Sequence, residues 1–481
     1  EGLRVGDVLH ITVSTTNKDP ALSGNAQALL PLLTKPMRAD FARVRLSWPV
    51  GTDLRWKSHR EITAKPVVTN GYNVLEIPLP LEKPEEVPAD APKRYQPLSL
   101  LEASTFDSWA QVSSVMAPLY DTKGMIAPGS PLAAEVEKIK AKSSDPKTRA
   151  ALALQLVQDK TRYLFNGMNG GNYRPQSPAD TWRMRYGDCK AKSLLLLALL
   201  HELDIDAQPV LASIGLGDLV PQRLPSAAAF NHVLVRAKVG GETLWLDGTK
   251  NGDRLIDITD TPDFGTVLPV QASGAGLEKI DLRYPARPDI SMSVTLDQRA
   301  GLNFPSLYEA SVAVHGPAAE MISTGWSQAD DEQKRDMVAR SVSSVLGDTL
   351  IVSKSLEQSK DGSGMVVLHA TGIADSGWDK RNDRYRKTLD QAVGEINFNP
   401  DRARTAWRDI PVKLSDPGGQ EVNIRVELPP EAKGVTLNGD TSLPETLAGY
   451  RLKRQVTLKD GVISVDDVVL SRGGEIPADR I

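Results

Sequence analysis

The stretch MRYGDCKAKSLLLLALLHELDI, residues 184–205, contains the only cysteine of this 481-residue chain. A Gly-Asp turn signal precedes Cys189, and a markedly apolar run follows it. Asp188 is a favourable helix N-cap, so we expect Cys189 to begin a helix of about four turns. A thiol at a helix N-terminus faces unpaired backbone N–H groups and the positive end of the helix dipole, which stabilise a thiolate. Two roles are open at this point: a nucleophile, or a small hydrophobic residue packed in the core.

A cysteine nucleophile needs a base, and the chain has six histidines. Four of them lie in or beside predicted strands of the flanking regions. His201 lies on the same predicted helix as Cys189, twelve residues further on, which separates the two by about 18 Å along the axis. The remaining candidate is His232, which follows the helix in sequence.

His232 lies in AFNHVLVRAKVGGETLWLDGT, residues 229–249, which has the pattern of two alternating strands around Gly240-Gly241. A two-residue loop places Leu234 opposite Asp247, so that His232 and Asp247 project from one face as diagonal neighbours, roughly 7–8 Å apart at the backbone. A slip of one residue would place them on opposite faces. The register therefore predicts that the Asp247 carboxylate can reach the His232 imidazole.

Three signatures in this order resemble the transglutaminase-like core, a papain-related fold: GDCK before a leucine-rich helix, then NHVLV, then WLDGT. The resemblance implies a triad in which Cys189 is the nucleophile, His232 the base and Asp247 the orienting acid. The chain has Gly248 where the family more often has proline. The segment TRYLFNGMNGGNYRPQSPADTWRMRYGDCKAKS, residues 161–193, further resembles a bacterial subgroup in which a β-rich domain of unknown function precedes this core.

Acyl transfer through a thioester on Cys189 is the chemistry that the resemblance implies. The developing oxyanion needs two donors, for which the Cys189 backbone N–H and the Trp182 indole N–H are candidates. Tyr173 is a candidate substrate contact, at the end of a glycine-rich segment (166–174) that we interpret as a loop at the edge of the cleft. We expect no cofactor and no metal, because the chain has one cysteine and no second histidine at metal-ligand spacing beside His201.

The hydropathy pattern divides the chain into modules. We expect a β-rich N-terminal domain (1–82), a proline-rich linker (83–97), the transglutaminase-like core (98–265), a second linker (266–289) and a β-rich C-terminal domain (290–481). The predicted fold class is α+β, with a papain-like or transglutaminase-like core flanked by two β-rich, sandwich-like domains. The chain opens on Glu1 rather than Met, so we expect a processed form with an incomplete N-terminal domain.

Individual segments within these modules carry clear periodicity. VGDVLHITVST (5–15), FARVRLSWPV (41–50) and YNVLEIPLPL (72–81) alternate at period two and predict strands. Residues 131–142 and 145–165 carry apolar residues at helical spacing and predict helices, the second beginning after Asp145.

Charge and hydropathy exclude two classes of partner. The formal net charge is −4, so the chain lacks the cationic field that holds nucleic acid. The longest apolar run is seven residues (194–200), against about 20 needed to span a bilayer. We expect a protein or peptide substrate, and the resemblance suggests a periplasmic or cell-envelope location. The sequence carries no signal for the oligomeric state.

Three functions fit this pattern. The first is acyl transfer on a glutamine side chain or a peptide bond, with an amine as acceptor. The second is a cysteine protease or amidase that uses water as acceptor on the same triad. The third is a non-catalytic scaffold, whose β modules bind a partner.

Overall fold

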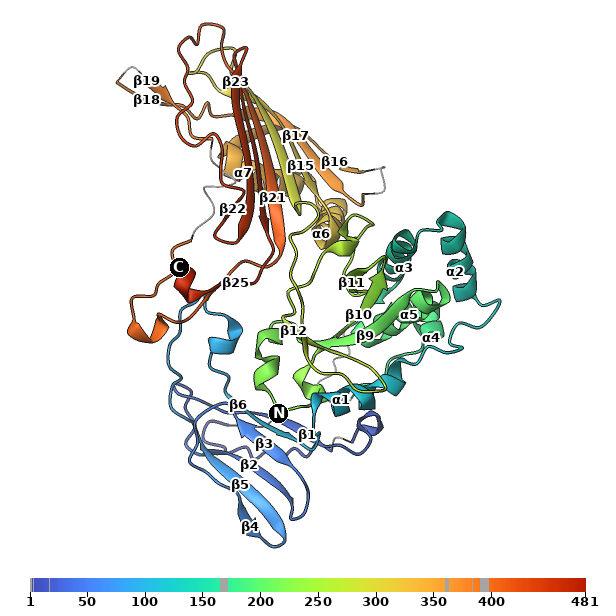
Figure 1. Cartoon of the computed structure of the whole chain (residues 1–481). Helices are drawn as coiled ribbons and strands as arrows, with labels where there is room; N and C mark the ends of the chain where they lie inside the picture. Colours follow the sequence, from blue (N-terminus) through green and yellow to red (C-terminus); the bar gives the residue numbers. More distant parts are fainter. Residues whose placement is uncertain are drawn as a thin grey trace.

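The computed structural model describes residues 2, 4–16, 18–164, 172–359, 363–382, 384–389 and 398–481. Three parts follow one another along the chain and in space: an N-terminal β module, a central module of helices around a sheet, and a large C-terminal sheet with two helices (Figure 1). The predicted α+β class is confirmed.

Two small sheets form the N-terminal module. Its strands are β1 (Gln27–Pro31), β2 (Ala42–Pro49), β3 (Arg55–Ser58), β4 (Val67–Thr69), β5 (Tyr72–Leu79) and β6 (Leu100–Ser104). The sheet orders are β1-β6-β3 and β2-β5-β4, and apolar side chains such as Leu75, Ile77 and Leu101 form the core between them. The predicted strands in 41–50 and 72–81 are confirmed. β6 follows the predicted linker in sequence yet completes the first of these sheets.

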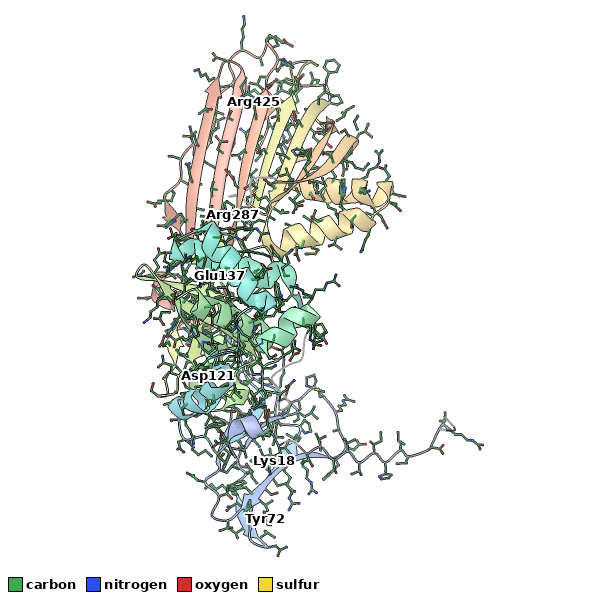
Figure 2. All side chains as sticks on the ribbon, turned by 90° about the vertical axis from the view of Figure 1, so that its right-hand side faces the viewer. Lys18, Tyr72, Asp121, Glu137, Arg287 and Arg425 are labelled. Carbon is green, nitrogen blue, oxygen red and sulfur yellow. The ribbon has the colours of Figure 1, made fainter. Side chains whose placement is uncertain are left out.

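The strand predicted in residues 5–15 is absent from the structure. This segment is an extended tail that leaves the body of the molecule near Lys18 (Figure 2). Its apolar side chains Val8, Ile11 and Val13 are between 73% and 80% exposed. The prediction was wrong because a period-two pattern becomes a strand only beside a partner strand, and no described residue pairs with this segment.

The central module is built around one buried helix. Its elements are α1 (Trp109–Met116), α2 (Pro131–Lys142), α3 (Pro146–Lys160), β7 (Arg162–Tyr163), α4 (Pro178–Met184), β8 (Tyr186–Gly187), α5 (Cys189–Glu202), β9 (Asp206–Ala212), β10 (His232–Val239), β11 (Glu242–Leu246), β12 (Thr266–Pro269) and β13 (Glu278–Lys279). α5 packs on the sheet β11-β10-β9-β12-β13 and against α3 and α4. The apolar run 194–200 is buried all round, as a helix without a polar face requires.

Two expectations for the central module can be compared with the structure directly. α2 and α3 confirm the two predicted helices, and the Asp145 side chain caps α3 by accepting a hydrogen bond from the Thr148 N–H. β12 and β13 lie in residues 266–289, the segment we expected to be a linker, and they extend the central sheet beyond β9. The chain therefore returns to this sheet once before it enters the C-terminal part.

The C-terminal part is built on one large sheet with helices on one face, beside two small two-stranded sheets. Its elements are β14 (Ile290–Asp297), β15 (Ser306–Val314), α6 (Gly316–Gln328), α7 (Asp331–Leu346), β16 (Thr349–Gln358), β17 (Val366–Ala374), β18 (Asp379–Arg381), β19 (Arg384–Arg386), β20 (Val412–Lys413), β21 (Gly418–Glu427), β22 (Thr446–Leu447), β23 (Tyr450–Lys459), β24 (Val462–Ser471) and β25 (Glu475–Ile476). The eight-stranded order is β16-β17-β15-β14-β21-β24-β23-β22. Val338, Val342 and Leu346 of α7 pack on this sheet, so helices provide the second layer where we expected a sandwich of two sheets.

The predicted proline-rich linker is held in place by ion pairs. Arg94 contacts Asp218 of the central module at 3.0 Å and Glu475 of the C-terminal part at 2.7 Å. Asp90 contacts Arg402 at 2.9 Å. This segment therefore connects the central and C-terminal parts as a packed element. Within the described residues, every helix is too short or too polar to cross a bilayer.

Candidate active site

Cys189 is the first residue of α5, as predicted. Asp188 caps the helix: its Oδ1 accepts a hydrogen bond from the Ala191 N–H at 3.0 Å. Gly187 is required by close packing, since a Cβ there would lie 2.8 Å from the Ala191 Cβ and 3.2 Å from Cγ2 of Thr181. The Gly-Asp-Cys sequence thus lets the chain turn tightly and presents the thiol at the helix N-terminus.

His232 and Asp247 come together through the predicted hairpin register. Val235 pairs with Leu246 across β10 and β11, which confirms the two-residue loop. His232 begins β10, and its Nε2 lies 2.8 Å from Oδ2 of Asp247. The other carboxylate oxygen accepts hydrogen bonds from the backbone N–H and the hydroxyl of Thr249, at 2.9 and 2.7 Å. Both carboxylate oxygens are therefore paired, and the imidazole is oriented.

Gly248 replaces the proline that the family resemblance led us to expect, and packing explains the glycine. A Cβ at this position would lie 3.2 Å from Cγ1 of Val157 on α3 and 3.5 Å from the Cβ of Lys192 on α5. Glycine lets the end of the hairpin approach both helices closely. The exchange leaves the Asp247 carboxylate in contact with His232.

Buried polar side chains that we did not predict connect α3 and α5 to the chain segments packed against them. The Ser193 hydroxyl donates to the Val233 carbonyl at 2.9 Å, next to His232. Lys192 Nζ donates to the Thr161 carbonyl at 2.7 Å, and burial lowers the pKa of this lysine to about 8. Gln158 Nε2 donates to the Asp247 carbonyl at 2.9 Å. These residues have no local sequence signal, because each one is defined by a partner far away in the chain.

The three side chains of the candidate triad are buried, with Cys189 and His232 each 3% and Asp247 5% exposed. Burial disfavours an imidazolium, but the charge and hydrogen bond of Asp247 outweigh it, and Cys189 adds a smaller contribution. Together they raise the pKa of His232 to about 9. Burial likewise opposes the Asp247 carboxylate, yet His232 and Thr249 hold the pKa of Asp247 at about 2. The site therefore favours a charged imidazole beside the cysteine.

Two tyrosines lie close enough to the thiol to sense its charge. Burial, followed by the charges of Cys189 and Asp188, raises the pKa of Tyr163 to about 12 and raises the pKa of Tyr120 as well. Tyr163 is 44% exposed. The Tyr120 hydroxyl is buried and forms no hydrogen bond with any described residue.

Trp182 and Tyr173, the two further residues singled out from the sequence, lie in the same hydrophobic core cluster as Cys189. The Arg185 guanidinium stacks over the Trp182 ring at 3.7 Å. Tyr173 is only 1% exposed, and its hydroxyl accepts a hydrogen bond from Gln27 of the N-terminal module at 2.5 Å. That position differs from the exposed one that a direct substrate contact needs.

The glycine-rich loop predicted at residues 166–174 lies outside the described residues, except for its last three positions.

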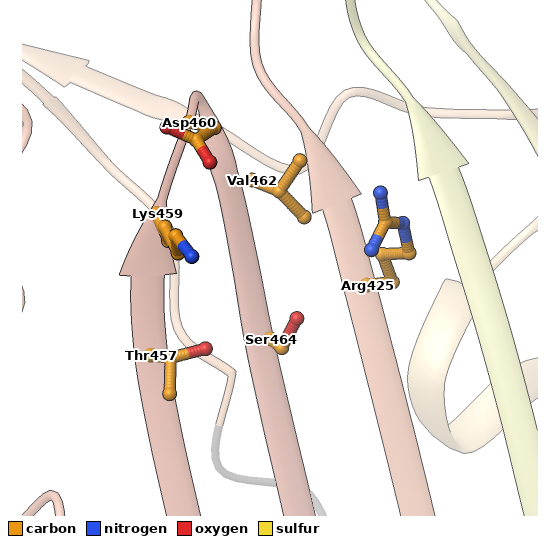
Figure 3. Close-up of a pocket in the computed structure, with 6 residues that line it drawn as sticks. All are labelled: Arg425, Thr457, Lys459, Asp460, Val462 and Ser464. Carbon is orange, nitrogen blue, oxygen red and sulfur yellow. The ribbon is translucent and has the colours of Figure 1, made fainter.

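Two hollows on the described surface are lined by residues other than those of the triad. One of about 290 Å³ lies on the C-terminal sheet, between the side chains of β21, β23 and β24 (Figure 3). No group of three or more His, Cys, Asp or Glu side chains in the described residues is arranged to hold a metal ion.

No family model and no curated protein matches the chain. Among solved structures, the chain is similar to a "putative protease" from Parabacteroides distasonis ATCC 8503, with a TM-score of 0.53 and 15% identity over 95% of this chain and 71% of that one. A second match, a "putative cysteine protease" from Cytophaga hutchinsonii, has a TM-score of 0.21 and 13% identity over 47% of this chain and 75% of that one. The first similarity shows a shared fold over nearly the whole of this chain.

Proposed function

We propose that this protein is a cysteine enzyme that forms a thioester with the acyl group of a protein or peptide amide. The observation that carries the proposal is the buried His232 imidazole, whose Nε2 is hydrogen-bonded to Asp247 and whose pKa is raised by Asp247 and, to a smaller extent, by Cys189. A histidine with a purely structural role would be paired with backbone groups and would not need a cysteine at a helix N-terminus beside it.

In the first half-reaction the Cys189 sulfur attacks the amide carbonyl carbon and forms a C–S bond. The C–N bond breaks, and the nitrogen leaves as ammonia from a glutamine side chain or as an amine from a peptide bond. His232 supplies the proton that the leaving nitrogen needs. Asp247 stabilises the imidazolium before that transfer and keeps Nε2 of the ring engaged, so that Nδ1 is the nitrogen available to the thiol.

The oxyanion of the tetrahedral intermediate needs hydrogen-bond donors near the sulfur. The Cys189 backbone N–H belongs to the first turn of α5, and the Asp188 cap binds the Ala191 N–H instead. We assign the Cys189 N–H as the first donor and propose the Trp182 indole N–H as the second. The Trp182 ring belongs to the same core cluster as Cys189 and is oriented by the stacked Arg185.

In the second half-reaction an acceptor attacks the thioester carbonyl while His232 removes a proton from it. The C–S bond breaks, and the thiolate is restored. An amine acceptor gives a new amide, which is transglutaminase-like acyl transfer. Water gives a carboxylic acid, which is protease or amidase activity. The solved structure from Parabacteroides distasonis is named a putative protease, which supports the hydrolytic alternative.

Labelling of Cys189 by iodoacetamide tests the proposal without knowledge of the substrate. We expect wild-type protein to label rapidly near pH 6, where an isolated thiol is protonated, and His232→Ala to label slowly. His201→Ala is the matched control, since His201 lies at the far end of α5 and pairs with Thr122. Equal, slow labelling of wild type and His232→Ala would reject the enzyme and favour the scaffold.

The acceptor is identified by a second assay. A glutamine-donor peptide is incubated with and without a primary amine, and ammonia release and the mass of the peptide are measured. Amine incorporation supports acyl transfer, whereas a gain of one mass unit at glutamine or cleavage of the peptide supports hydrolysis. For the cell, we propose a periplasmic or envelope location and a protein or peptide substrate.

A further inference from the structure

Residues 222–228 are attached to the N-terminal module along their whole length. This segment crosses the module boundary and then runs into β10, whose first residue is His232. Its partners are side chains of β1, β3 and β6. The contacts are Lys57 Nζ to the Gln222 carbonyl, Arg223 Nε to Glu102 (2.6 Å), the Leu224 N–H to Glu102 (3.1 Å), Ser104 Oγ to the Pro225 carbonyl (2.6 Å), and Ser226 Oγ and the Ala228 N–H to Gln27 (2.7 and 3.1 Å).

Gln27 joins this segment to the chain that leads to the cysteine. Its Oε1 accepts from Ser226 and Ala228, while its Nε2 donates to the Tyr173 hydroxyl at 2.5 Å. The Tyr173 N–H in turn donates to Asp19 of the N-terminal module at 3.1 Å. One amide side chain therefore contacts both segments, the one that leads into α4 and Cys189 and the one that leads into His232.

The connection from this segment to His232 is short and rigid. The Arg223 guanidinium donates to the Ala229 carbonyl at 3.2 Å, three residues before His232. Phe230 is fully buried and packs edge-on against the Trp109 ring. The Asn231 N–H donates to the Ala212 carbonyl, which lies on the strand that pairs with His232. A displacement of residues 226–229 would therefore be transmitted to the imidazole.

The boundary between the two modules also contains buried charge, which makes its geometry specific. The Glu102 carboxylate is almost fully buried between Arg223 and His59, with His59 Nε2 at 2.9 Å. A buried carboxylate is costly unless its partners stay in place, so this cluster resists sliding of one module over the other.

We propose that Gln27 is a positioning residue of the candidate active site, through which the N-terminal module holds the segments leading to His232 and to Cys189 in register. The N-terminal β module then contributes to catalysis by positioning residues of the candidate active site. This inference rests on the proposed function, because it assumes that the Cys189–His232 contact is used in catalysis.

The test is the pH profile of Cys189 alkylation in the full chain with Gln27→Leu and Gln27→Glu. Gln27→Leu removes all three contacts, and a displaced imidazole no longer stabilises the thiolate, so we expect labelling near pH 6 to fall about tenfold or more while labelling near pH 10 is unchanged. Gln27→Glu keeps an acceptor for Ser226, Ala228 and the Tyr173 hydroxyl, and it should restore the wild-type profile. Ser226→Ala removes the hydrogen bond to Gln27 and also the bond that the Ser226 hydroxyl accepts from the Ala228 N–H, while Gln27 keeps its contacts with Ala228 and Tyr173, so it should give an intermediate profile.

Two controls separate the possible outcomes. Arg43→Gln removes an exposed ion pair with Glu76 in the same module but far from the boundary, and it should leave the profile unchanged. Thermal unfolding of each variant shows whether the fold is retained, and Ser226→Ala replaces Gln27→Leu if the latter unfolds. A wild-type profile in both Gln27→Leu and Ser226→Ala would overturn the positioning role, whereas equal labelling of wild type and His232→Ala would overturn the proposed function itself.

Discussion

At the scale of single residues, the buried His232–Asp247 pair determines the electrostatics of the candidate site. Each partner is almost inaccessible to water. Asp247 raises the pKa of His232 and His232 lowers the pKa of Asp247, so each stabilises the charged form of the other. Thr249 satisfies the carboxylate oxygen that His232 leaves open. Because both charges are paired and hydrogen-bonded, the desolvation that would normally discourage an imidazolium is offset.

Replacement of Asp247 by alanine should lower catalysis without unfolding the protein, because Asp247 orients the His232 imidazole. The imidazole loses its partner at Nε2 and the charge that stabilises its protonated form, so we expect kcat to fall by about two to four orders of magnitude. The far-ultraviolet circular dichroism spectrum should stay that of wild type. Asp206→Ala, at an exposed strand end, is the control and should keep full activity. Full activity of Asp247→Ala would show that the carboxylate plays no part in the reaction.

The same pair makes stability depend on pH in a defined direction. The pKa of His232 is raised from 6.5 to about 9, so its contribution is complete below about pH 6.5 and is lost as the pH rises through about 9. The pKa of Asp247 is lowered from 3.8 to about 2, so its contribution is present above about pH 4 and is lost as the pH falls through about 2.

Urea unfolding of wild type and of the double variant His232→Asn/Asp247→Asn measures this contribution. The difference in unfolding free energy should be largest between about pH 4 and 6.5 and should decrease toward pH 9, by on the order of 1 kcal/mol per pKa unit. A difference that stays constant from pH 6 to pH 9 would contradict a charged His232 in the folded protein.

At the scale of elements, the site depends on how closely the start of α5 approaches α4 and the start of β10. Gly187 allows the approach to α4, since any Cβ there would collide with Ala191 and Thr181. Ser193 attaches α5 to β10 beside His232. The helix and the hairpin each form from local signals, but these two contacts hold the start of α5 close to α4 and to β10.

Gly187→Ala should therefore damage the site through packing. We expect a loss of about 1–3 kcal/mol in unfolding free energy, as for other overpacked positions, together with slower alkylation of Cys189. Gly276→Ala is the matched control, because a Cβ at that position meets no atom within 4 Å. Unchanged stability and labelling in Gly187→Ala would mean that the helix start can shift without consequence.

At the scale of the whole molecule, the modules are joined by charged side chains at both boundaries. Glu102, Arg223 and His59 lie between the N-terminal and central parts. Arg94 lies between the central and C-terminal parts and contacts a carboxylate of each. These pairs connect each module to its neighbour by specific side chains, so their loss should loosen the boundary at which each one lies.

Arg94→Gln should loosen the proline-rich segment at residues 83–97. Two partly buried ion pairs are lost, so limited proteolysis within this segment should accelerate by about threefold to tenfold. Cleavage sites can be located by mass spectrometry. Lys83→Gln, which loses only an exposed pair with Glu86, is the control. A proteolysis rate equal to that of wild type would show that other contacts hold the segment.

The amino-acid sequence by itself determines the parts of this protein that depend on neighbouring residues. The cap at Asp188, the helix that begins at Cys189 and the register that brings Asp247 to His232 follow from signals within a few residues or across one tight turn. Periodicity likewise predicted the strands at 41–50 and 72–81 and the helices α2 and α3, because an apolar pattern reports the face that will be buried.

The tertiary structure alone decided everything that requires a distant partner. The alternating pattern at residues 5–15 forms no strand, since hydrogen-bonded pairing needs a second segment beside it. Local pattern did not indicate that Tyr173 would be buried against Gln27. Periodicity predicted a helical stretch at about 317–346, but not that its helices would cover one face of the C-terminal sheet. Contacts between residues more than a hundred positions apart depend on how whole elements pack, and no local pattern encodes that arrangement.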